Sequence, residues 1–128
     1  YIQKNLLDSA LIYANKAIQI GKSLGYDYLY HFALRNMGDI YTQKGDYPQA
    51  LASFKEVLVY AHQQEDNFLI VSTNNRIGKI FLMQKNDLMA LKSFREVIRV
   101  GEKYYFPFES YFAYKYITEA YQRNKEID

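Results

Sequence analysis

The chain has 128 residues, of which 49% are hydrophobic and 23% charged, a balance typical of a folded globular domain and not of a disordered segment. It contains no cysteine, which excludes disulfides, thiolate metal sites and cysteine catalysis. Its 16 basic and 14 acidic residues leave a net charge of +2, too balanced for a dedicated nucleic-acid binder, and no run of about 20 apolar residues predicts a membrane span.

Turn residues predict where the first three expected helices begin and end. The first runs over about residues 6–24 and is ended by Gly25. The second, over about 28–44, stops at Lys44, where a cation meets the negative end of the helix dipole and Gly45 can adopt a left-handed conformation. The third, over about 47–65, follows Asp46, which suits an N-cap, and has Pro48 in its tolerant first turn.

Three further helices are expected over about residues 68–84, 87–104 and 108–124. The fourth ends at Lys85–Asn86, where Asn86 can take the left-handed position. Apolar residues recur at spacings of three, four and seven, as on the buried face of a helix. Because the linkers are only two or three residues long, neighbouring helices are predicted to run antiparallel.

An internal repeat runs through the whole chain without insertions. Glycines, alanines and phenylalanines recur 40 positions apart, as in Gly38/Gly78, Ala50/Ala90 and Phe54/Phe94. A fourfold aromatic series has the same period: Tyr1, Tyr41, Phe81 and Tyr121. We therefore expect one all-α domain over residues 1–128, divided into a partial repeat 1–26, repeats 27–66 and 67–106, and a partial repeat 107–128. The partial repeats predict a fragment of a longer protein.

The phased motifs resemble the tetratricopeptide repeat family, in its long form found in bacterial signalling regulators and sensor kinases. They combine an aliphatic-Gly-x-x-aromatic pattern on one helix with Ala-x-x-x-Phe on the next, as in Met37–Tyr41 with Ala50–Phe54 and Ile77–Phe81 with Ala90–Phe94. The resemblance implies a right-handed α-solenoid of six helices that works as a non-catalytic scaffold for proteins or peptides, as the sensing or docking domain of a larger bacterial regulator.

In this family the first helix of each pair lines a concave binding face. Side chains at the corresponding non-core positions are the candidate peptide-binding residues: Arg35, Asn36, Asp39, Asn75, Arg76, Lys79, Lys115, Tyr116, Glu119 and Arg123. Basic residues outnumber acidic ones among them, which favours a peptide with acidic groups. The alternative is an ordinary solvated helix face. In some members of the family a ladder of asparagines binds the peptide backbone, and only Asn36 matches that ladder here. The set of residues with which some members clamp a peptide's terminal carboxylate has no match.

A second hypothesis is structural self-association through the ends of the helix stack. The repeat register predicts exposed side chains on the first and last helices: Ala10, Ala14, Ala17, Ile18, Tyr114, Ile117 and Tyr121. Two positions depart from the repeat pattern, since Ala14 replaces the phenylalanine of the first copy and Thr118 replaces the glycine of the last.

No pattern typical of catalysis or of a cofactor site is found in the sequence. His31 and His62, the two histidines, lack metal-ligand spacing, and no Gly-rich phosphate loop or nucleophile motif is present. We therefore expect no enzyme activity, metal or cofactor. The aromatic run Tyr104–Tyr116 has too few cations nearby for nucleic-acid binding. We expect a cytoplasmic location, or alternatively a periplasmic or other extracytoplasmic part of a membrane-anchored regulator.

Overall fold

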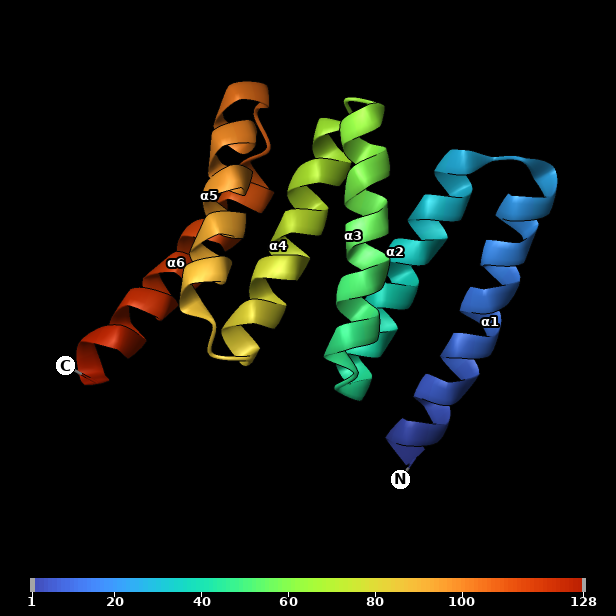
Figure 1. Cartoon of the computed structure of the whole chain (residues 1–128), viewed down its shortest axis with the longest axis horizontal. Helices are drawn as coiled ribbons and strands as arrows, with labels where there is room; N and C mark the ends of the chain where they lie inside the picture. Colours follow the sequence, from blue (N-terminus) through green and yellow to red (C-terminus); the bar gives the residue numbers. More distant parts are fainter. Residues whose placement is uncertain (1, 128) are drawn as a thin grey trace. The chain divides into compact units, whose positions relative to one another are not determined.

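The computed structural model describes the backbone of residues 2–127 and the side chains of residues 3–124. Tyr1, the first member of the predicted aromatic series, lies outside the described residues. Within them the chain is all-α, with six helices and no strand (Figure 1). The helices are α1 (Ile2–Leu24), α2 (Asp27–Lys44), α3 (Tyr47–Gln63), α4 (Asn67–Met83), α5 (Asp87–Tyr104) and α6 (Pro107–Ile127).

The helix boundaries follow the predictions closely, with differences at both ends of the chain. Helix α1 already begins at Ile2, because residues 3–5 contain no glycine or proline that would break it. Helix α6 begins at Pro107, since proline lacks the amide hydrogen that would have no partner at the first helical position. It also continues past the predicted end at residue 124.

All five turns between helices close in the same way, twenty residues apart. One or two residues after the end of each helix lies a residue with a positive φ angle, and the next amide donates to the carbonyl five residues before it, as from Asp46 to Tyr41 at 2.9 Å. This is the Schellman pattern that satisfies the last carbonyls of a helix. The left-handed residues are Gly25, Gly45, Glu65, Lys85 and Tyr105, with φ angles of 70°, 80°, 53°, 60° and 63°.

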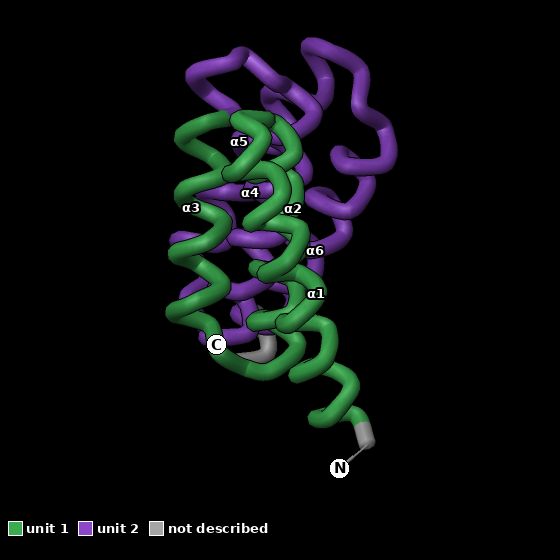
Figure 2. The backbone as a smooth tube through the Cα atoms, turned by 90° about the vertical axis from the view of Figure 1, so that its right-hand side faces the viewer, with its two compact units in different colours: residues 1–60 green, residues 61–128 purple. Residues whose placement is uncertain are grey.

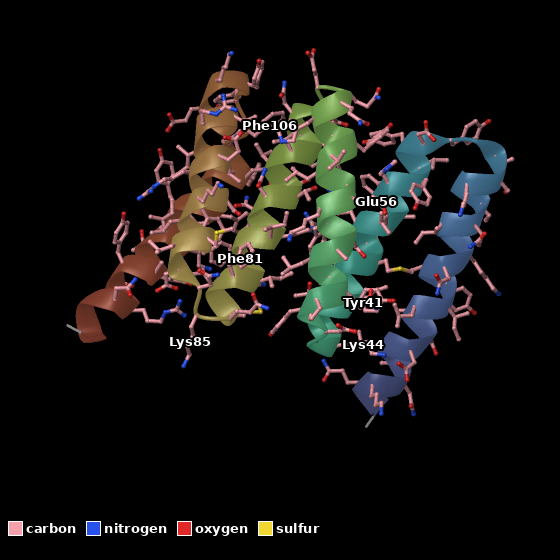
Figure 3. The ribbon with its side chains drawn as sticks, in the orientation of Figure 1. Tyr41, Lys44, Glu56, Phe81, Lys85 and Phe106 are labelled. Carbon is pink, nitrogen blue, oxygen red and sulfur yellow. The ribbon has the colours of Figure 1, made fainter. Side chains whose placement is uncertain are left out.

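One turn prediction is therefore wrong by one residue. Lys85, which Figure 3 labels in the turn between α4 and α5, takes the left-handed conformation, and Asn86 does not. Asn86 instead caps the following helix, because its side chain accepts a hydrogen bond from the Met89 amide at 3.4 Å. Asp46 caps α3 as predicted, accepting from the Gln49 amide at 3.3 Å.

The chain forms two compact units, residues 1–60 and residues 61–128, and each is described separately (Figure 2). In the first unit α1 packs on α2, and the Lys44 ammonium lies 2.6 Å from the Asp8 carboxylate. The buried Phe54 ring of α3 lies against Gly38 of α2. The Tyr30 hydroxyl of α2 donates to Glu56 of α3 at 2.8 Å.

In the second unit α5 packs against α4, and α6 packs against both. The fully buried Phe94 ring of α5 lies against Gly78 of α4 and stacks on Tyr116 of α6, with ring centroids 5.3 Å apart. Consecutive helices thus pack within each unit as in a helical repeat solenoid, which confirms the predicted fold class. None of the helices over the described residues is both long and apolar enough to cross a membrane.

Candidate functional site

A hollow of about 430 Å³ lies between α4 and α6 in the second unit. Helix α4 contributes three side chains to its lining, and α6 contributes four. The lining residues are Lys79, Leu82, Met83, Tyr116, Glu119, Ala120 and Arg123, and we call this hollow the α4–α6 groove.

The spacing of these residues explains the groove. Residues three and four apart on a helix share one face, so Lys79, Leu82 and Met83 point the same way from α4. Ala120 is almost fully buried, and its small side chain leaves space between the two helices. The stacking of Tyr116 on Phe94 holds its ring at one side of that space.

The charges of the groove differ from the expectation, because Arg123 is not a free cation. Its guanidinium donates to the Leu82 carbonyl at 3.1 Å and forms an ion pair with Asp87, the first residue of α5. Lys79 and Glu119 are exposed on α4 and α6. The groove therefore presents one cation and one anion over a mainly apolar floor, and counting Arg123 toward a positive binding face was wrong.

Two further candidates were expected at non-core positions and are buried. Arg35 is 6% exposed, and its guanidinium lies 4.4 Å from the centroid of the Phe32 ring one turn earlier on α2. Asn75 is 9% exposed and donates to the Glu109 carbonyl at the start of α6 at 2.9 Å. Periodicity marked both as groove positions, but neighbouring side chains cover them, so neither offers an open surface to a ligand.

The structure brings four of the ten predicted peptide-binding residues together in the α4–α6 groove: Lys79, Tyr116, Glu119 and Arg123. Arg76 is half-buried on α4 and donates to the Ser72 carbonyl at 3.0 Å. Lys115 lines a second hollow of about 470 Å³, whose lining residues all belong to α6: Tyr111, Tyr114, Lys115, Thr118, Glu119 and Gln122. Asn36 is exposed and Asp39 half-buried, and both belong to the first unit.

The predicted self-association residues are exposed to different degrees. Ala17 is exposed, as are Tyr114 and Tyr121, whereas Ala10, Ala14 and Ile117 are half-buried. Ile18 was expected on the exposed face and is buried. It lies three residues before Gly21, where a Cβ would stand 2.8 Å from the Tyr30 backbone nitrogen, so Ile18 is on the side of α1 that α2 covers.

Sequence reasoning missed a row of exposed apolar residues on α1, which are Leu6, Tyr13, Ile20 and Leu24. They follow one another at spacings of seven, seven and four, which places them on a single face of the helix. That spacing was a usable signal. It was overlooked because the repeat register drew attention to the alanines at the motif positions.

Hydrogen bonds to carboxylates change two tyrosine pKa values. The Tyr114 hydroxyl donates to Glu102, which raises the pKa of Tyr114 because the bonded carboxylate disfavours a phenolate. The same arrangement with Glu56 raises the pKa of Tyr30. On α5 the Arg99 guanidinium bonds the Glu96 carboxylate at 2.6 Å and lowers the pKa of Glu96. These groups bond neighbouring helices or turns and do not line the α4–α6 groove.

Over the described part of the chain, no three His, Asp or Glu side chains are grouped in a way that could hold a metal ion. Comparison of the chain with family models, curated proteins and solved structures found no significant match.

Proposed function

We propose that this chain is a non-catalytic scaffold of the tetratricopeptide type that binds a protein or peptide segment in the α4–α6 groove. The observation that carries the proposal is the groove itself, a hollow of about 430 Å³ with an apolar floor and exposed charges beside it. That volume lies within the range of about 300–1,000 Å³ typical of ligand pockets. In this proposal the chain is the sensing or docking domain of a larger bacterial regulator in the cytoplasm.

The lining favours a peptide of mixed character over a strongly acidic one. Leu82, Met83 and Tyr116 offer apolar and aromatic surface to an apolar side chain of the ligand. Lys79 has no ion-pair partner among the described residues, so it can meet a carboxylate of the ligand. Because Asp87 already pairs with Arg123, we expect a single acidic contact and not a cluster of them.

The proposal is tested by selecting 12-residue peptides from a displayed random library and measuring their affinities by fluorescence polarisation. Two substitutions at exposed positions, Lys79→Glu and Met83→Arg, place an opposite charge and a bulky cation in the groove. We expect each to weaken the selected peptides by roughly tenfold or more, the range for losing a charge-paired contact. The matched control is Lys92→Glu, which reverses an exposed charge on α5 outside the groove.

Thermal unfolding of all three variants shows whether the fold is kept. Recovered peptides should also be enriched in an apolar residue with an acidic residue nearby. The groove hypothesis is wrong if the library yields no binder, or if the binders lose no affinity on Lys79→Glu and Met83→Arg while both variants remain folded.

A further inference from the structure

Helix α5 carries a row of four cations along its exposed side. The row consists of Lys92, Arg95, Arg99 and Lys103, all of them exposed. Their spacings of three, four and four residues place them on one face of the helix. At 1.5 Å per residue the row is about 17 Å long. We call these four residues the α5 basic row.

An exposed leucine continues the row toward the start of the helix. Leu88 is 83% exposed and precedes Lys92 by four residues, so the two side chains lie on the same face. With that exposure Leu88 adds little to the core of the second unit. The face therefore offers a partner one apolar side chain and, beyond it, four cations.

The equivalent positions one repeat earlier show that the fold does not require these cations. Counted back 40 residues, the row corresponds to Ala52, Lys55, Val59 and Gln63 on α3, which include a single cation and are all exposed. Helices precede and follow α3 in the chain. Exposure at these positions therefore belongs to the outward side of this kind of helix, and does not depend on an end of the chain.

Three of the four cations have no acidic partner among the residues that the structure describes. Arg99 is paired, because its guanidinium bonds the Glu96 carboxylate at 2.6 Å. Arg95 donates to the neutral Tyr121 hydroxyl at 3.0 Å, which leaves its charge uncompensated. Lys92 and Lys103 form no ion pair within the described part of the chain.

Two acidic residues flank the row on the same helix. Glu96 bonds Arg99 and lies close enough to His62 to interact with it electrostatically. Glu102 accepts a hydrogen bond from the Tyr114 hydroxyl. The outward side of α5 thus combines a line of cations with anions beside it, and is not a uniformly positive surface.

This mixture of charges favours a partner whose own charges are discrete. A nucleic-acid strand or an anionic membrane brings negative charge to every position, including those beside Glu96 and Glu102. Such partners also normally require more than three unpaired cations. A helix can instead place carboxylates three and four residues apart on one face, at the same pitch as the cations of α5, and leave its other positions neutral.

We infer that the α5 basic row docks an acidic helix of another protein, aligned along α5, with an apolar side chain that covers Leu88. Each exposed ion pair adds little, so the contact is weak and sensitive to salt. The inference does not rest on the α4–α6 groove, whose lining contains none of these residues. Because Lys92 lies outside the groove, Lys92→Glu should spare the groove peptides while it weakens the acidic helix.

The experiment measures the binding of a fluorescein-labelled, alanine-rich helical peptide by fluorescence polarisation. Four glutamates follow one another at spacings of four, four and three residues, and a leucine follows four residues later, as an antiparallel match to the row requires. A control isomer has the same composition with its glutamates distributed around the helix. We expect the matched peptide to bind roughly tenfold more tightly than the isomer, and both to weaken as salt is added.

Charge reversals at the two ends of the row test which residues bind. Lys92→Glu and Lys103→Glu should each weaken the matched peptide by roughly fivefold or more, the upper range for an exposed ion pair. The matched control is Lys55→Glu, which reverses the exposed cation at the equivalent row position of α3 and should leave the affinity unchanged. Thermal unfolding of the three variants shows whether the fold is kept.

An exchange of charges tests the alignment. Replacing the last glutamate of the peptide by lysine should restore binding to Lys92→Glu and not to Lys103→Glu, and replacing the first glutamate should do the reverse. If both peptides rescue both variants equally, the helix is not aligned along α5 and the inference is wrong.

Four further outcomes overturn the inference. The first is no binding of the matched peptide at low salt, and the second is equal binding of the two isomers. The third is tighter binding of single-stranded oligothymidine or of phosphatidylserine vesicles, which would assign the row to nucleic acid or to a membrane. The fourth is a loss of affinity on Lys79→Glu as large as on Lys92→Glu, which would place the peptide in the α4–α6 groove.

Discussion

The rings of Phe54 and Phe94 occupy space that exists only because a glycine faces them. A Cβ at Gly38 would lie 2.5 Å from the Phe54 ring, and one at Gly78 would lie 2.6 Å from the Phe94 ring. Both rings are fully buried, so they have little room to move away. At the scale of single residues, each recurring glycine and the phenylalanine facing it therefore form one packing pair.

The alanine variant of Gly78 tests the packing pair of Gly78 and Phe94. Gly78→Ala should lower the free energy of unfolding by about 1–3 kcal/mol, because the added methyl group overpacks the core. Phe94→Leu should cost less in the Gly78→Ala background than in the wild type, since the shorter side chain relieves the clash. Urea unfolding of the double-mutant cycle measures both effects. Strictly additive losses would show that the two side chains do not compete for the same space.

The left-handed turn residues give a second prediction at this scale. A Cβ at Gly45 would meet no atom within 4 Å, so Gly45→Ala should act through the backbone alone and lower the free energy of unfolding by about 1 kcal/mol. Lys85 has the same conformation with a side chain, so Lys85→Gly should be neutral or stabilising. Thermal unfolding of the two variants measures both effects. An equal loss of stability in both would contradict the explanation.

At the scale of helices, Arg123 joins three of them. From α6 its guanidinium reaches the Leu82 carbonyl near the end of α4 and the Asp87 carboxylate at the start of α5. The Asn124 side chain donates to the same carboxylate at 2.9 Å. The Leu82 carbonyl also accepts from the Lys85 amide at 3.0 Å, so Arg123 bonds a carbonyl of the α4–α5 turn and fixes the position of α6 against that turn.

Replacing Arg123 should therefore loosen α6. Arg123→Met keeps much of the apolar stem and removes the charge, and we expect it to lower the free energy of unfolding by about 1–3 kcal/mol, the range for hydrogen bonds to charged groups. Lys92→Met, which removes an exposed cation on α5, is the matched control and should change little. If both variants unfold at the same urea concentration, the bonds of Arg123 do not stabilise the unit.

The ion pair between α1 and α2 makes a pH prediction. The hydrogen bond from Lys44 lowers the pKa of Asp8, so the pair stabilises the fold above the unfolded-state pKa, and this contribution is lost as the pH falls through the folded-state pKa. An NMR titration should give Asp8 a midpoint below the ordinary aspartate value, and Lys44→Met should raise it. A midpoint that Lys44→Met leaves unchanged would exclude the pair in solution.

At the scale of the whole chain, the two units repeat the same local packing. Each contains one glycine–phenylalanine pair, Gly38 with Phe54 and Gly78 with Phe94. In a repeat protein, stability is close to a sum of terms from neighbouring elements, and a local defect weakens mainly the elements around it.

Hydrogen exchange measured by mass spectrometry tests this independence. Gly38→Ala should speed exchange mainly in the first unit, and Gly78→Ala mainly in the second, because each added methyl group disturbs only its own pair. The two variants serve as controls for each other. Equal acceleration in both units from either substitution would show that the chain opens as a single cooperative body.

The six helices and their turns were predictable from the sequence because the interactions that define them are local. Apolar residues at helical spacing marked α2 to α5, and the residues before and after Gly45 placed one turn within a residue or two. The register of Gly78 with Phe94 was also readable, since a fold of repeated units uses the same packing each time. For the candidate site, this was enough to select Lys79, Tyr116, Glu119 and Arg123, which share the α4–α6 groove.

Only the tertiary structure decided which of the candidate side chains are open to a ligand. Periodicity gives the direction of a side chain from its helix, but not what lies opposite it. In the structure Arg123 forms an ion pair with Asp87, and the buried Asn75 side chain donates to the Glu109 carbonyl of α6. The exposure of Tyr13 and Ile20 on α1 has the same origin, because an apolar helix face is buried only where another helix covers it.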